Sequence, residues 1–176
     1  MNTSFIESTD YSSAFEIALS FVLAMEGGFV DDPDDPGGMT RYGISQRAYP
    51  DLDIRHLTQA QASAIYYQDY WQPCQCDHLP VATACVLFDT AVNMGQGTAI
   101  KLLQQSVNTQ VDGVIGQQTI AACFRERCAH YLPDMLSRRA KRYHQIAQDE
   151  KQSRFFRGWM RRLFELQQRL HEERLL

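Results

Sequence analysis

Three residues between positions 26 and 40 have the types and the spacing that acid–base chemistry on a sugar requires. Glu26 is followed by Asp35 after eight intervening residues and by Thr40 after four more. Glycosidases use one carboxylic acid to protonate the leaving oxygen and a second carboxylate to activate water or attack the sugar. A hydroxyl group can hold the attacking water through a hydrogen bond. We therefore predict Glu26 as the general acid, Asp35 as the carboxylate that activates water or attacks the sugar, and Thr40 as a hydroxyl that can hold the water.

The segment before Glu26 favours this role. Apolar residues recur at three- and four-residue steps from Phe15 to Met25, which predicts a core helix. A serine at position 12 or 13 would cap this helix, and Gly27 would end it. Apolar surroundings and the terminal carbonyl groups of a helix both disfavour an ionised carboxyl. A carboxylic acid that stays protonated is what a general acid needs, and the plainer alternative is an exposed glutamate at a helix end.

Residues 27–44 differ from the rest of the chain. They contain five glycines, two prolines and four aspartates, which predicts turns with a short hairpin and excludes a helix. Asp31 and at least one of Asp32 and Asp34 are expected only to form turns beside the prolines. An EF-hand calcium loop is excluded because it requires a glutamate at its twelfth position, where counting from Asp32 gives Gly43.

The cysteines predict neither a disulfide framework nor a metal site. There are five of them, an odd number that suits a reducing cytosol. Cys74 and Cys76 are too close for a zinc knuckle and no second pair follows, while Cys123 and Cys128 would point to different faces of a helix. We expect buried or idle thiols, no metal and no other cofactor.

The charge distribution is uneven. The net charge is −4, and this mild acidity argues against a nucleic-acid-binding protein, which is usually basic. Residues 137–176 carry 11 basic and 5 acidic side chains, whereas residues 1–136 carry 6 basic and 16 acidic ones. The basic segment is expected to be a solvated helix face, or else a surface attracted to an anionic wall or membrane.

The remainder of the chain predicts helices joined by short turns. Thr58 and Gln61 form a capping box that opens a helix to about Tyr70, and residues 71–80 form a linker. Further helices are expected at 81–94, 99–107, 116–128, 133–149 and 155–173, with Pro133 in a first turn. In the last helix an apolar stripe is expected to lie opposite the arginines. The predicted fold is mainly α with a small Gly/Asp-rich loop or hairpin lobe.

The stretch from Glu26 to Ile44, EGGFVDDPDDPGGMTRYGI, resembles the signature of glycoside hydrolase family 108. That signature reads E-G-G-Y/F-x-x-D-P-x-D-x-G-G-x-T-x-x-G-I. Further blocks of the family resemble residues 69–71, 76–80, 88–93, 112–116 with Thr119, and 156–159 with Arg162. The resemblance covers residues 15–170.

The resemblance implies a lysozyme-like helical fold and N-acetylmuramidase activity on peptidoglycan glycan strands. It implies a catalytic region at 12–107 and a C-terminal region at 108–176, similar to a predicted peptidoglycan-binding domain and packed as one unit with the first. Glu26 corresponds to the catalytic glutamate of the family. The spacing of Glu26, Asp35 and Thr40 is similar to the triad of phage-type lysozymes, which has gaps of eight and five residues and implies inversion. Asp32 matches an aspartate that is fixed in the signature. We interpret it first as a residue that organises the loop, and second as a rival to Asp35 for the role of base.

Sugar binding needs flat rings and amide or carboxyl partners, and three residues are candidates. Tyr42 supplies a ring, and Asn93 ends an apolar helix where it could face a cleft. Asp89, inside the same apolar run, is either a buried hydrogen-bond hub or a substrate ligand, because a buried charge requires a partner in both cases. Trp71 and Phe88 are expected to pack in the core.

Two alternatives to a muramidase remain open: a lytic transglycosylase, and a non-catalytic protein that binds the wall and assists secretion. Residues 1–13 carry two acids and no base, unlike a signal peptide, and the apolar run 15–25 is too short to span a bilayer. We expect synthesis in the cytoplasm and action in the periplasm or cell wall after export or lysis. An endolysin, a wall-remodelling enzyme and an exported antibacterial toxin all fit, and the sequence alone identifies no secretion or immunity partner.

Overall fold

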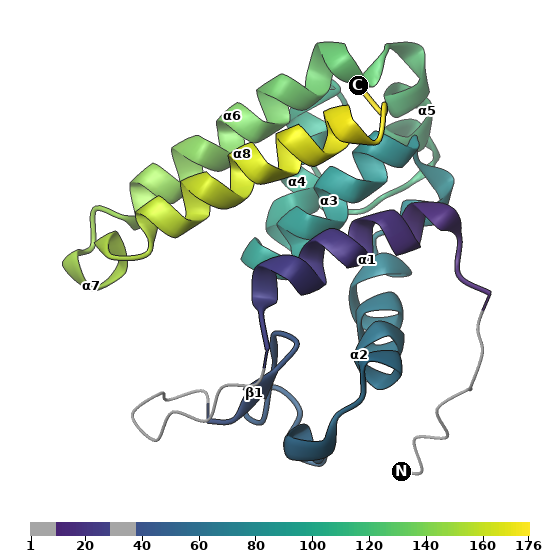
Figure 1. The fold of residues 1–176 in the computed structure, drawn as a ribbon. Helices are drawn as coiled ribbons and strands as arrows, with labels where there is room; N and C mark the ends of the chain where they lie inside the picture. Colours follow the sequence, from purple (N-terminus) through teal and green to yellow (C-terminus); the bar gives the residue numbers. More distant parts are fainter. Residues whose placement is uncertain (1–9, 29–37) are drawn as a thin grey trace.

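The computed structural model describes residues 10–28 and 38–176. The described chain is mainly helical, with one two-stranded hairpin (Figure 1). The predicted mainly α fold with a small hairpin lobe is therefore confirmed. The helices are α1 Ser13–Glu26, α2 Gln59–Tyr66, α3 Val81–Met94, α4 Gln96–Ser106, α5 Gln117–Arg125, α6 Cys128–Ile146, α7 Glu150–Ser153 and α8 Phe156–Glu172. Shorter elements are β1 Thr40–Arg41, β2 Ile44–Ser45, η1 Ile54–His56, η2 Tyr67–Trp71 and η3 Cys76–His78.

The helix α1 begins and ends where its sequence predicts. The Ser12 hydroxyl accepts a hydrogen bond from the Phe15 N–H at 3.3 Å, which caps the first turn. Gly27 has a φ of 76° and donates its N–H to the Leu23 carbonyl. A glycine adopts this left-handed conformation without strain, so the helix stops at Glu26. Glu26 is thus fixed at the rim of the core that the rest of α1 helps to build.

The central element is α3, whose residues from Ala82 to Ala91 are all buried. It packs against α1 on one side and against α4 and α6 on others. The rings of Phe15, Trp71 and Phe88 meet edge to face at 5.2–5.8 Å between centroids, a geometry that aromatic pairs favour. Trp71 and Phe88 therefore lie in the core, as predicted.

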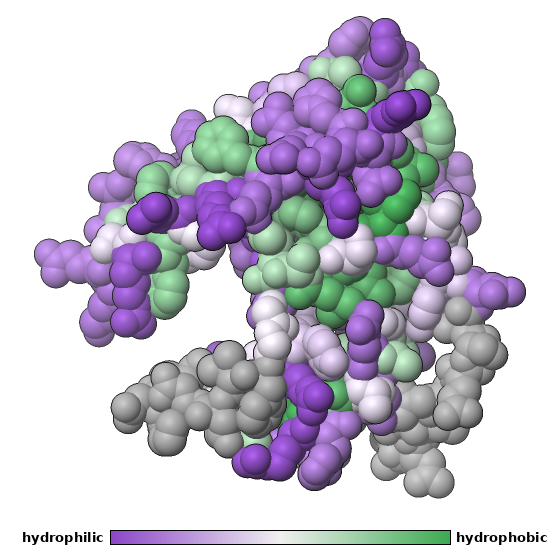
Figure 2. All heavy atoms as spheres, viewed as in Figure 1, coloured by the Kyte–Doolittle hydropathy of each residue, from purple (hydrophilic) through white to green (hydrophobic). Residues whose placement is uncertain are grey.

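The helices α6 and α8 lie side by side as an arm above the body, with α7 at its tip (Figure 1). Leu132 and Met135 of α6 and Leu163, Leu166 and Leu170 of α8 are buried beneath the arm. The surface is hollowed under the arm, beside the end of α1 (Figure 2). Within residues 10–28 and 38–176, no helix combines the length and apolarity needed to cross a bilayer.

Several predicted boundaries are wrong. The helix α2 ends at Tyr66, and the chain continues to Trp71 as a π-helical turn rather than as α-helix to Tyr70. The helix α4 begins at Gln96, three residues before the predicted start. The helix α6 begins at Cys128, so Pro133 lies inside it and not in its first turn. An interior proline removes one intrahelical hydrogen bond and its ring crowds the carbonyl four residues earlier. The neighbouring Leu132 and Met135 are buried, so packing of this turn against the core opposes that cost.

Candidate active site

The Glu26 carboxyl group lies at the junction of the body and the arm. Its side chain is 24% exposed, and its Oε1 accepts a hydrogen bond from Arg162 Nη1 of α8 at 2.6 Å. The two residues are 136 positions apart in the chain. This contact fixes the direction in which the carboxyl group points. It also places a positive charge beside a group for which the sequence predicts only apolar neighbours.

The hairpin presses its turn against Glu26. Strands β1 and β2 pair antiparallel, with Thr40 opposite Ser45, and the two turn residues Tyr42 and Gly43 both have positive φ angles of 54° and 77°. This is the two-residue geometry that suits a tight hairpin. A Cβ atom on Gly43 would lie 2.7 Å from the Glu26 Cγ, closer than atoms can pack. Only glycine therefore allows this approach.

Two tyrosines complete the surroundings of Glu26. The Tyr66 hydroxyl donates to the Tyr42 carbonyl at 2.8 Å, which ties the hairpin to α2. Burial, followed by the negative charge of Glu26, raises the pKa of Tyr66. Burial also raises the pKa of Tyr70, with the charges of Asp69 and Glu26 as further causes. Because both pKa values are raised, both phenols stay protonated beside Glu26. The π-helical turn that carries Tyr70 is a distortion often found at functional sites.

Behind Glu26 lies a buried ionic network. Arg162 Nε lies 2.8 Å from Asp89 Oδ1, and Arg139 Nη1 lies 2.5 Å from Asp89 Oδ2. The Asp89 and Arg139 side chains are 1% and 0% exposed. Burial alone would raise the pKa of Asp89, but the two guanidinium groups outweigh it and hold this pKa below its ordinary value. Buried charges of this kind are stable only when they are paired and hydrogen-bonded.

The network continues from Arg139 to the end of α3. Arg139 Nε donates to the Tyr143 hydroxyl at 2.9 Å, and this hydroxyl donates to Asn93 Oδ1 at 2.5 Å. Charges alternate along the chain of contacts from Glu26 through Arg162 and Asp89 to Arg139. The side chains of α1, α3, α6 and α8 are thereby held in one register, which positions Glu26 from behind.

A cavity of about 370 Å³ opens next to this network, between the ends of α1 and α3 and the first turns of α8. Met25, Asn93, Trp159 and Arg162 are among its lining residues. It combines an aromatic ring, an amide and a guanidinium group beside the candidate general acid. Such a mixed lining suits a sugar, which offers both apolar faces and hydroxyl groups.

The comparisons with known proteins agree with this site. The family model described as "Glycosyl hydrolase 108" matches residues 19–95, and the one described as "Predicted Peptidoglycan domain" matches residues 91–164. The solved structure titled "Structure of Brucella abortus SagA" is 31% identical, with a TM-score of 0.76 over 88% of this chain and 92% of that chain. The chain belongs to glycosyl hydrolase family 108. No protein among the curated sequences matches it.

The chain is therefore a glycoside hydrolase that acts on peptidoglycan, with a lysozyme-like helical fold. The first matched segment contains Glu26, and the second contains Arg162 and Arg139. The ion pair between Glu26 and Arg162 thus joins the two segments at the candidate active site of this hydrolase.

Four of the predicted site residues besides Glu26 have described positions. Thr40 lies two residues before the turn that contacts Glu26, and its hydroxyl is 3.5 Å from the Gly38 carbonyl. Tyr42 is in that turn and half-buried, and Asn93 lines the cavity. The contacts of Asp89 correspond to the buried hub, the first of its two expected roles.

Some predicted groups lie outside the described residues. Asp35, the expected partner of Glu26, is one of them, and so is its rival Asp32. Among the residues that the structure does describe, no group of three or more His, Cys, Asp or Glu side chains is arranged to hold a metal ion.

Arg162 and Arg139 are the main site residues that the sequence reasoning missed. The prediction that the arginines of the last helix lie opposite its apolar stripe is wrong for Arg162, which is buried and faces Glu26 and Asp89. The signal was its spacing, since position 162 lies three residues after Trp159 and four before Leu166, both members of the stripe. Arg139 likewise follows Met135 and precedes Tyr143 by four residues, on the buried face of α6.

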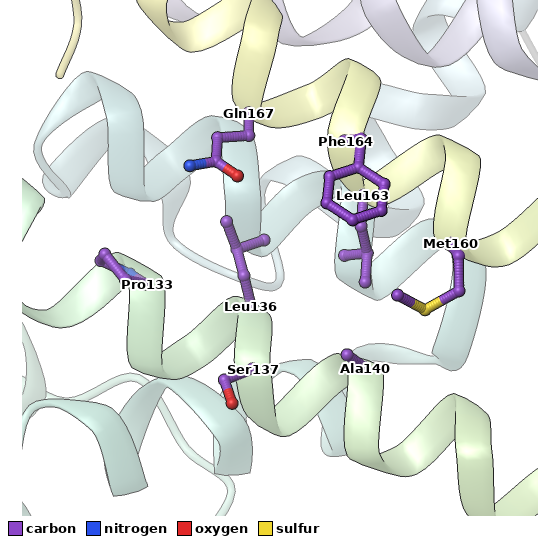
Figure 3. A pocket seen from close by; sticks show the side chains of 8 residues that line it. All are labelled: Pro133, Leu136, Ser137, Ala140, Met160, Leu163, Phe164 and Gln167. Carbon is purple, nitrogen blue, oxygen red and sulfur yellow. The ribbon is translucent and has the colours of Figure 1, made fainter.

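A second cavity, of about 230 Å³, lies between α6 and α8 (Figure 3). Leu136, Met160, Leu163 and Phe164 point into it, and its lining includes no acidic or basic side chain. It offers no group for acid–base chemistry. The cavity beside Arg162 is therefore the better candidate for substrate.

Proposed function

We propose that this family 108 hydrolase is an N-acetylmuramidase that cleaves the β-1,4 bond between N-acetylmuramic acid and N-acetylglucosamine. Glu26 is the general acid that protonates the leaving oxygen. The observation that carries the proposal is the position of Glu26, a partly exposed carboxyl group held by Arg162, whose own side chain lines a mixed polar and aromatic cavity. Its match to the catalytic glutamate of the family supports the same role.

Arg162 acts in this proposal as a positioning residue. It binds one carboxyl oxygen of Glu26 at 2.6 Å and is itself fixed by Asp89. Once Glu26 has given its proton to the leaving oxygen, the group becomes a carboxylate, and the adjacent guanidinium stabilises that charge. Asp89 then influences catalysis through Arg162, because its own carboxylate is buried.

On the opposite face of the sugar, Asp35 and Thr40 position the attacking water. This assignment implies inversion of the anomeric centre, with the two carboxyl groups roughly 6.5–9.5 Å apart. Tyr42, from the hairpin, and Asn93, from α3, contact the sugar from two sides of the site. An α-anomer as the first product supports the assignment, and a trapped glycosyl-enzyme intermediate contradicts it.

The division of the chain into a catalytic region at 12–107 and a C-terminal region at 108–176 is part of the same proposal. The C-terminal region supplies Arg139 and Arg162, so we propose that it completes the catalytic site as well as contacting the wall. An endolysin, a wall-remodelling enzyme or an exported antibacterial effector would each use this activity. An exported form would have a secretion partner, and an antibacterial effector would have an immunity partner.

Analysis of the ends of digested sacculi tests the proposal. Wild type should release fragments with reducing N-acetylmuramic acid ends, identified by mass spectrometry, and Glu26→Gln should release none. Anhydromuramic ends would instead identify a lytic transglycosylase, which needs no water-activating base. Binding of sacculi without cleavage by wild type would favour a non-catalytic wall-binding protein.

A further inference from the structure

A third cavity lies next to the one beside Arg162, at the end of α3. This third cavity has a volume of about 280 Å³, and it shares Asn93 and Trp159 with the cavity beside Arg162. Its other walls come from the start of α4 and the last turns of α6, including Thr98 and Arg142. The two cavities therefore lie next to each other, with Asn93 and Trp159 lining both, and together we call them the groove. We call the part beyond Trp159 the distal compartment.

Rigid groups separate the two parts of the groove. The Trp159 ring stacks on the buried Tyr143 ring at 5.2 Å between centroids and 16° between planes. Asn93 Oδ1 accepts the Tyr143 hydroxyl, which leaves the amide N–H groups of Asn93 as what this side chain offers to a ligand. An aromatic face and an amide donor are therefore fixed at the entrance to the distal compartment.

The distal compartment also holds a cation, the guanidinium group of Arg142. Arg142 lines it, and no described carboxylate forms an ion pair with Arg142. Two neighbouring arginines of the arm do have a carboxylate partner, since Arg138 pairs with Asp134 at 2.6 Å and Arg161 with Glu165 at 2.5 Å. A guanidinium group binds a carboxylate through two parallel hydrogen bonds, so the compartment is suited to an anionic group with planar oxygens.

We propose that the distal compartment binds a carboxylate of the peptide stem, with Arg142 as its counter-ion. The proposal rests on the muramidase function proposed above. The muramic acid of that substrate carries a peptide whose free carboxylates lie to the side of the glycan strand. A glycan bound next to Glu26 therefore has an anionic branch that can extend past Trp159. The consequence is a preference for glycan that still carries its stems.

The test compares cleavage of two substrates, glycan strands with intact stems and the same strands after an amidase has removed the stems and the lactyl carboxylates that this hydrolysis frees have been converted to methyl amides. Arg142→Gln should lower the ratio of kcat/KM for stem-bearing over stem-free strands by about three- to tenfold, because one charge-assisted contact is lost. Arg138→Gln, one turn earlier on α6 and outside the groove, is the matched control and should leave the ratio unchanged. An unchanged ratio in Arg142→Gln would overturn the proposal.

A binding measurement separates this proposal from the muramidase assignment. The probe is the disaccharide–peptide from sacculi, titrated calorimetrically into Glu26→Gln protein, with the peptide-free disaccharide, its lactyl carboxylate converted to a methyl amide, as comparison. The stem should tighten binding, and adding Arg142→Gln should abolish that gain. Equal binding of both probes would refute the distal compartment even if cleavage is confirmed. Failure of wild type to cleave either strand, with the stem effect on binding intact, would refute only the muramidase assignment.

Discussion

Replacement of Asp89 by asparagine is expected to be among the most destabilising single changes in the protein. The substitution keeps the shape of the side chain and removes its charge, so Arg139 and Arg162 lose their shared counter-ion. Arg139 is 0% exposed and Arg162 is 9% exposed, so water cannot replace the lost partner. Removing one member of a buried pair costs about 3–5 kcal/mol. A typical domain has only about 5–15 kcal/mol in total.

Urea denaturation followed by circular dichroism measures this loss. A domain of this size loses about 2–4 °C of melting temperature per kcal/mol, so a fall of about 10 °C is expected as well. Asp134→Asn is the matched control, because Asp134 also pairs with an arginine at 2.6 Å but is 47% exposed, and its pair should be worth less than about 1 kcal/mol. If Asp89→Asn costs no more than Asp134→Asn, the buried network does not stabilise the fold as argued.

Three further predictions follow from the same contacts. The pKa of Asp89 is lowered, so its carboxylate stabilises the folded state above about pH 4, the ordinary pKa, and this contribution is lost as the pH falls toward the folded pKa. The difference in unfolding free energy between wild type and Asp89→Asn should therefore narrow below about pH 4. A constant difference from pH 7 to pH 3 would contradict this. Gly43→Ala should lower the free energy of unfolding by more than about 1 kcal/mol and reduce sacculus cleavage, because the new Cβ would clash with Glu26 and residue 43 has a positive φ. Gly97→Ala in α4 is the control, since its Cβ would meet open space and the change should be neutral or stabilising. Equal melting temperatures for the two variants would refute the close approach of the hairpin to Glu26. Arg162→Lys keeps the charge but cannot bind Glu26 and Asp89 together, so kcat should fall about tenfold or more. Arg169→Lys, which changes an exposed ion pair, is the control and should have the kcat of wild type. A wild-type kcat in Arg162→Lys would exclude the positioning role.

Local signals made much of the fold predictable from the sequence. The start of α1 follows from a serine cap, its end from a glycine, and the start of α2 from the capping box of Thr58 and Gln61. These features act within four residues of one another, which is the range that sequence patterns report. The position of Glu26 at the rim of the core follows from them directly. The π-helical turn at Tyr67–Trp71 could not be predicted from local signals, because it depends on packing against the core.

Long-range partners were beyond such patterns. Asp89 is an isolated charge in an apolar run, so the sequence predicts that it needs a partner but not which one. Its partners lie 50 and 73 positions away, on two other helices. Arg162 and Arg139 could have been suspected as charges on apolar faces, since each interrupts a stripe at helical spacing. Their convergence on Asp89, and the contact of Arg162 with Glu26, required the tertiary structure.

The rate of glycan cleavage by Glu26→Gln tests the role of Glu26 most directly. Purified wild type, Glu26→Gln and Glu16→Gln are compared on the same stem-bearing strands, with circular dichroism to confirm that all three fold. Glu16 lies on the same helix and is exposed, so its substitution controls for the loss of one charge from α1. We predict that Glu26→Gln loses at least about a hundredfold in kcat, as expected for a missing general acid, and that Glu16→Gln matches wild type. A folded Glu26→Gln protein with wild-type kcat would contradict the assignment of Glu26 as the proton donor.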